Sequence, residues 1–108
     1  MFHYITYPDQ SCTGVQVWYS KGHSDSAEWA TAVQSAVTTL LQPDNHRRTK
    51  AAGGNIYILH RAKTPAILVE CGFLSTPAEC ERLCDPDYRL ALAMTLFAAI
   101  EQKNATRY

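Results

Sequence analysis

The sequence predicts an α/β fold in which helices cover both faces of a mostly parallel β-sheet. Three observations carry that prediction. Residues 14–19 alternate apolar and polar side chains, which is typical of a strand with one buried face. Residues 26–42 place apolar side chains at helical spacing. Residues 66–69 are continuously apolar, which is typical of an interior parallel strand with both faces covered.

The predicted helix over 26–42 has recognisable boundaries. Ser24 or Asp25 can cap its start, and Pro43 ends it. Its buried stripe is expected to comprise Ala30, Val33, Val37, Leu40 and Leu41.

The second half of the chain continues the alternation of strands and helices. Residues 55–59 are predicted to form a strand before the one at 66–69. Residues 76–79 form a capping box with proline at the first helical position, which predicts a short helix. Residues 85–86 repeat the start signal for a final helix. Its buried face is expected to comprise Leu90, Ala93, Phe97 and Ile100.

Three strands make a narrow sheet, and a doubly covered central strand needs neighbours on both edges. The first predicted strand begins at Gly14, close to the start of the sequence. We therefore expect a sheet truncated at its N-terminal side, within a single partial domain over residues 1–108.

Composition excludes several classes of protein. In 108 residues, 10 Lys or Arg balance 10 Asp or Glu, which argues against a nucleic-acid-binding protein. No stretch approaches the roughly 18 apolar residues of a membrane span, and the N-terminus does not resemble a signal peptide. Cysteines at 12, 71, 80 and 84 are too sparse for a disulfide framework. They favour small buried side chains or free thiols over a metal site.

Glu70 is the most informative position, because it follows the apolar run 66–69. Glutamate is rarely placed in such a setting without a partner or a task. In open α/β sheets, ligands bind beyond the carboxyl ends of the strands, which favours Glu70 as a general base. A structural ion pair with Arg48 or Lys50 explains the position equally well.

Three of the four histidines, His23, His46 and His60, are expected at the surface, since they lie in polar surroundings. His3 opens an extended stretch and can lie at the same sheet edge as Glu70. Taken alone, it is as well explained by a partly buried ring.

Residues 65–77 read PAILVECGFLSTP. This stretch closely resembles the signature of the zinc-dependent N-acetylmuramoyl-L-alanine amidases of the third amidase family, which includes spore-cortex and cell-wall amidases of bacteria. Thr76 stands where the family usually has asparagine. The stretches 11–20 and 56–61 are similar to neighbouring family segments, as are Asp87 and Tyr88 with the closing helix, so the resemblance covers nearly the whole chain.

The resemblance implies a role for two residues. Glu70 matches the catalytic glutamate of the family. His3 lies eleven residues before Gly14, the spacing at which the family has a zinc-binding histidine, although Ile5 stands where asparagine is usual. Zinc is the implied cofactor, held by three ligands with a fourth position for water.

The implied substrate is peptidoglycan, cleaved at the amide between N-acetylmuramic acid and L-alanine. The implied location is outside the cytoplasm, at the cell wall. The family's first half supplies another zinc histidine and a glutamate ligand, and neither precedes His3. We therefore expect this chain to be the C-terminal portion of an amidase domain, with weak zinc binding, little hydrolysis alone, and self-association or a missing N-terminal half as partner.

Two other interpretations remain open. The first is a non-catalytic module of the same fold that binds peptidoglycan or another partner. The second is a small α/β protein in which Glu70 serves only a structural ion pair.

Overall fold

The computed structural model of this protein describes residues 2–5, with 3–5 as backbone only, and residues 12–106. Four strands form one sheet: β1 (Phe2–Ile5), β2 (Gln16–Tyr19), β3 (Lys50–Ala51) and β4 (Ile67–Phe73). Four helices accompany it: α1 (Ser24–Leu40), α2 (Tyr57–His60), α3 (Pro77–Cys84) and α4 (Pro86–Ala105). No helix among these residues is long and apolar enough to cross a membrane.

The sheet has the strand order β1-β4-β2-β3. β1 runs parallel to β4 and β3 runs parallel to β2, whereas β2 and β4 are antiparallel. Two of these three pairings are parallel, so the predicted mostly parallel α/β sheet is confirmed. Residues 67–69 of the apolar run lie in β4, an interior strand that is parallel to β1 but antiparallel to β2, so the expectation of a parallel strand holds on one side only.

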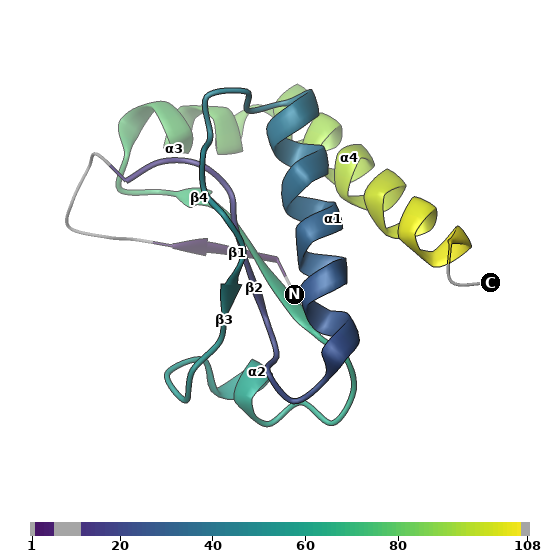
Figure 1. Ribbon diagram of the computed structural model, residues 1–108. Helices are drawn as coiled ribbons and strands as arrows, with labels where there is room; N and C mark the ends of the chain where they lie inside the picture. The colour runs from purple at the N-terminus through teal and green to yellow at the C-terminus, as the bar shows by residue number, and fades with distance from the viewer. Residues whose placement is uncertain (1, 6–11, 107–108) are drawn as a thin grey trace.

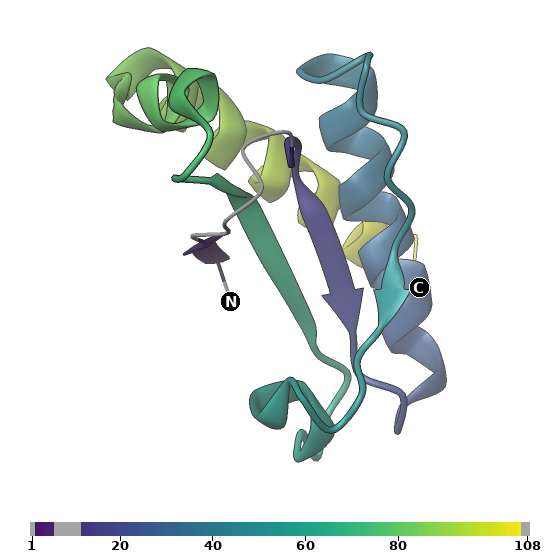
Figure 2. The same ribbon diagram turned by 90° about the vertical axis from the view of Figure 1, so that its left-hand side faces the viewer.

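Helices α1 and α4 cover one face of the sheet (Figures 1 and 2). The main core on this face joins Val17 and Val69 of the sheet to Val33 and Val37 of α1 and to Leu96 of α4. On the opposite face, α2 covers only one end, where Leu59 packs with Ala52 and Leu68. The rest of that face carries a pocket lined by both polar and aromatic side chains, among them Glu70 and Trp18.

Glutamine side chains of the first helix and the turn after it complete the hydrogen bonding of β2. The Val17 N–H donates to Gln34 Oε1 at 2.9 Å, and Gln34 Nε2 donates to the Val15 carbonyl at 3.0 Å. The Val15 N–H donates to Gln42 Oε1 at 3.0 Å. β3 is too short to pair with this part of β2, so side-chain amides replace the missing strand.

The ends of α1 differ in one respect from the prediction. The helix begins at Ser24 with His23 at the N-cap, and no side chain caps it. Ser24 and Asp25 therefore lie in the first turn. The helix ends at Leu40, shortly before Pro43, in agreement with the expected stop.

The strand predicted at 55–59 is wrong. Residues 57–60 form α2, and the strand of this region is β3. Ile56 and Leu59 pack toward the sheet, whereas Tyr57 and Ile58 are 71% and 50% exposed. A spacing of three between buried positions suits a helical turn, and a run of four apolar residues cannot distinguish that from a strand.

The final helix begins where predicted, with the Asp87 N–H donating to the Asp85 side chain. Its predicted buried face is wrong, however. Leu90 and Phe97 are 60% and 66% exposed, Ala93 is also exposed, and Ile100 is only partly buried. The core is reached by Leu92, Thr95, Leu96 and Ala99. Apolar residues surround this helix on most sides, so their periodicity does not single out one face.

Candidate active site

Glu70 lies in the middle of β4, between two strands. Its Cα partners are His3 on β1 and Gln16 on β2. Side chains alternate along a strand, so Val69 and Cys71 enter the core while Glu70 points to the open face. The expectation that Glu70 ends its strand is therefore wrong, since β4 continues to Phe73. The Glu70 side chain therefore projects from the open face of the sheet and does not lie beyond the carboxyl end of β4.

The half-buried Glu70 carboxylate lines a pocket of about 490 Å³ on this open face. The other lining residues come from β2 and the segment before it, from the segment around β3 and from the end of β4: Cys12, Gln16, Trp18, Arg47, Lys50 and Phe73.

Trp18 is the direct partner of Glu70. Its indole Nε1–H donates to Glu70 Oε1, and the Lys50 ammonium lies 5.4 Å from the centroid of the Trp18 ring on the same face. Within residues 12–106, no ion pair joins Glu70 to a cation. The structural ion pair with Arg48 or Lys50 is thus wrong for the described residues, and the carboxylate keeps acceptor capacity for a ligand.

Gln16, which is the neighbour of Glu70 across the sheet, has an unpaired acceptor. The side chain is 2% exposed, and its Nε2 donates to the Arg48 carbonyl at 2.8 Å. Its Oε1 receives no hydrogen bond from the described residues. An unpaired buried acceptor is uncommon, and this one has almost no exposed surface, so a ligand in the pocket does not reach it without a movement of the side chain.

None of the three histidines whose side chains the structure describes lines the pocket with Glu70. His3 is placed by its backbone next to Glu70, whereas the half-buried His23 ring lies 3.3 Å from the Ala62 carbonyl. His46 and His60 are exposed, as predicted. No three His, Cys, Asp or Glu side chains within the described part of the chain form a metal cluster. These residues therefore do not complete a zinc site by themselves.

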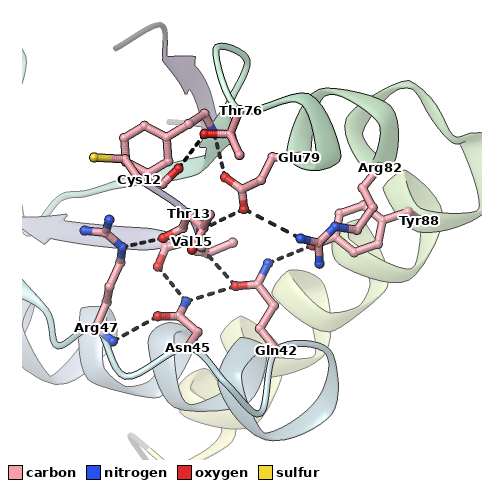
Figure 3. Close-up of polar contacts among 12 residues, drawn as sticks. Cys12, Thr13, Val15, Gln42, Asn45, Arg47, Thr76, Glu79, Arg82 and Tyr88 are labelled. Atoms are coloured by element: carbon pink, nitrogen blue, oxygen red, sulfur yellow. Dashed lines mark hydrogen bonds and ion pairs between the residues drawn. The ribbon is translucent and has the colours of Figure 1, made fainter. Parts of the chain in front are cut away.

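Glu79 is the residue whose role the sequence did not reveal (Figure 3). It is 3% exposed and accepts hydrogen bonds from the Gly14 N–H at 2.7 Å and the Phe73 N–H at 2.9 Å. Arg82 lies 3.9 Å away. The predicted capping box is wrong, because Glu79 turns inward and Thr76 donates to the Cys12 carbonyl at 2.6 Å. Glu79 thus joins the start of β2 to the end of β4.

A second polar cluster fixes the segment that enters the pocket (Figure 3). Asn45 Nδ2 donates to the Val15 carbonyl at 3.0 Å and to Gln42 Oε1 at 2.9 Å. Asn45 Oδ1 accepts the Arg47 N–H at 2.9 Å. Gln42 in turn donates to the Tyr88 hydroxyl at 2.8 Å. Arg47 is therefore anchored to β2 and, through Tyr88, to α4.

This architecture matches a known family. Residues 1–102 match the sequence family described as N-acetylmuramoyl-L-alanine amidase. The chain belongs to the third N-acetylmuramoyl-L-alanine amidase family. The resemblance noted in residues 65–77 is thereby confirmed.

Relatives of this amidase family support the assignment. The chain is 29% identical over 98 residues to the germination-specific N-acetylmuramoyl-L-alanine amidase of Bacillus subtilis, a match covering 91% of this chain and 40% of that protein. The CwlD amidase of Clostridioides difficile, solved in complex with the GerS lipoprotein, superposes with a TM-score of 0.90 and 28% identity over 97% of this chain and 53% of that one. An N-acetylmuramoyl-L-alanine amidase of Clostridium difficile 630 gives a TM-score of 0.85 and 27% identity, covering 99% and 57%. The chain thus spans about half the length of these relatives.

Proposed function

We propose that this chain contributes to peptidoglycan hydrolysis, at the amide between N-acetylmuramic acid and L-alanine, with Glu70 as the general base. The observation that carries the proposal is the position of Glu70 within the amidase fold. Its carboxylate lies on the open face of the sheet, lines a pocket and has no cationic partner among residues 12–106. A carboxylate in that state can accept a proton.

The proposed chemistry needs two proton transfers at one carboxylate. Glu70 accepts a proton from the attacking water as the new C–O bond forms at the amide carbonyl. It then delivers that proton to the nitrogen of the leaving L-alanine as the C–N bond breaks. The Trp18 indole holds Oε1 in place, so that the other carboxylate oxygen faces the substrate.

We also propose His3 as one zinc ligand, because its backbone lies directly beside Glu70. When bound, zinc makes water acidic enough to ionise near neutral pH and polarises a carbonyl. A single imidazole is not a complete site. The remaining ligands would come from outside the described residues, and we expect this chain alone to bind zinc weakly.

Residues 1–108 are accordingly proposed to be part of one catalytic domain that acts outside the cytoplasm, on the cell wall. The similarity to a germination-specific amidase supports a role in sporulation or germination. Leu90, Met94 and Phe97 are large apolar side chains exposed on α4. Their exposure supports self-association or contact with another polypeptide segment.

The proposal can be tested by incubating the purified chain with peptidoglycan and zinc, and labelling the free L-alanine amino groups that hydrolysis releases. We expect slow release, and a loss of about 100-fold or more in Glu70→Gln, the range for a general base. Glu81→Gln is the matched control, because Glu81 is exposed on α3, outside the pocket. Release that is equal in both variants would refute the role of Glu70.

A non-catalytic peptidoglycan-binding module is the second candidate, favoured by the absence of a three-ligand metal cluster in the described residues. Sedimentation with insoluble peptidoglycan separates the two. Binding without release of L-alanine termini, at any zinc concentration tested, would support the module.

A further inference from the structure

We propose that Arg47 and Lys50 form a carboxylate-binding subsite beside Glu70, which holds a free carboxylate of the peptide on the amine side of the cleaved bond. The inference deepens the proposed function, since the order of groups along the ligand rests on Glu70 being the general base. The subsite itself rests on the pocket's own charges and hydrogen-bonding groups.

Arg47 is held in place by contacts that leave its binding groups free. Its Nε donates to the Thr13 carbonyl at 2.7 Å, and its guanidinium carbon lies 5.2 Å from the centroid of the Phe73 ring. Its backbone N–H is bound by Asn45. Figure 3 shows the two terminal nitrogens turned away from the other residues drawn. A guanidinium fixed at Nε keeps two N–H₂ groups for an external acceptor.

The charges in the pocket are not paired with one another. Arg47, Lys50 and Glu70 all line it, yet no carboxylate within residues 12–106 lies at ion-pair distance from either cation. Lys50 lies over the Trp18 ring instead, while the Trp18 N–H binds Glu70. Trp18 thus contacts Glu70 through its N–H and Lys50 through its ring face, and the two charges do not pair with each other. Lys50 and Arg47 therefore both remain available to an anionic ligand.

The uncharged part of the pocket fits the same class of ligand. The rings of Trp18 and Phe73 supply the apolar part of the pocket. A peptide acid supplies apolar side chains for these rings and a carboxylate for the two cations. A neutral sugar supplies no charge for Arg47 and Lys50. The pocket is therefore suited to the peptide portion of a substrate, with its carboxylate at the Arg47 end.

Two small ligands that differ only in charge test this proposal: N-acetyl-L-alanyl-L-alanine and its C-terminal amide. Each is titrated into the ¹⁵N-labelled chain while the Trp18 indole N–H and the Arg47 Nε–H resonances are followed. We expect the acid to bind about tenfold more tightly than the amide, equivalent to about 1.4 kcal/mol. Arg47→Gln should abolish the difference, and Lys50→Gln should reduce it about threefold, because Lys50 is more exposed.

Arg48→Gln is the matched control, because this exposed neighbour does not line the pocket and should keep the full preference for the acid. The ¹⁵N spectrum of each variant verifies that it folds, and Lys50→Gln tests the subsite even if Arg47→Gln loosens the loop. Equal affinity for acid and amide, no saturable binding of either, or equal loss in Arg48→Gln would overturn the proposal. No zinc or hydrolysis is needed, so a failure here is distinct from a failure of Glu70 as general base.

Discussion

Glu70 and Glu79 lie nine residues apart and use their carboxylates in opposite ways. Glu79 is 3% exposed and accepts two backbone N–H groups from two different segments. Glu70 is half-buried, accepts one indole N–H and faces a pocket. A carboxylate whose acceptor positions are filled by the backbone holds the fold together. One that is only partly satisfied, beside a pocket, is available for chemistry.

The largest expected effect follows from removing the structural carboxylate. Glu79→Ala leaves the N–H groups of Gly14 and Phe73 without their acceptor. Each unsatisfied buried group costs about 1–3 kcal/mol, so the free energy of unfolding should fall by about 2–6 kcal/mol. Urea denaturation measures this, with the exposed Glu81→Ala as control. A loss below 1 kcal/mol would remove the contrast between the two glutamates.

A second comparison concerns neighbouring residues on α4. Leu96 is 3% exposed and belongs to the core, whereas Phe97 is 66% exposed. Leu96→Ala should therefore cost about 2–5 kcal/mol by cavity formation, and Phe97→Ala less than about 0.5 kcal/mol. Thermal or urea unfolding of the pair checks the orientation of the helix. A larger loss of stability in Phe97→Ala than in Leu96→Ala would support the buried face that the sequence predicted.

Gly14, which donates its N–H to Glu79, has a backbone conformation that favours glycine. Its φ of +91° is unfavourable for any residue with a side chain, and an added Cβ would lie 2.8 Å from Asn45 Nδ2. Gly14→Ala should cost about 1–2 kcal/mol from the backbone alone. Gly54→Ala is the control, because a Cβ there meets nothing within 4 Å. Equal stability of the two variants in urea would show that this turn adapts freely.

The smallest expected effect is local and concerns Glu70. Glu70→Gln replaces a charged acceptor for the Trp18 indole with a neutral one, which should change stability by about 1 kcal/mol or less. The Trp18 indole N–H resonance should move upfield in a ¹H–¹⁵N spectrum. Trp29 is the internal control, because it lines a different pocket. Equal shifts of both indoles would contradict a direct Trp18–Glu70 contact.

Sequence patterns predicted several helices and strands and singled out Glu70. They did not predict the interactions between segments that are distant in the sequence. The strand β4 and the starts of α3 and α4 follow from local signals, namely an apolar run and proline at the first helical position. Glu70 stood out because its charge conflicts with its neighbours. Glu79 did not, because its position in the first turn of a helix has a local explanation. Its real partners, Gly14 and Phe73, are distant or in another element.

The same limit applies to the pocket. The role of Arg47 depends on Thr13, which accepts from its Nε, and on Asn45, which accepts from its backbone N–H. The side of α4 that faces the core is decided by the elements packed against it, because apolar residues occur on most sides of this helix. The zinc role of His3 came from its spacing in a resemblance and stays a prediction.

The glutamine contacts along β2 affect where a further strand can pair with this sheet. Gln34 and Gln42 occupy the backbone groups of Val15 and Val17 on the side where β3 is too short to reach. A new strand finds little to bind there. Within residues 2–5 and 12–106, the sheet has two outer strands, which are β3 on this side and β1 on the other. β1 has four residues and β3 only two, so β1 offers the longer edge, and a chain segment that extended the sheet there would lie beside the backbone of His3.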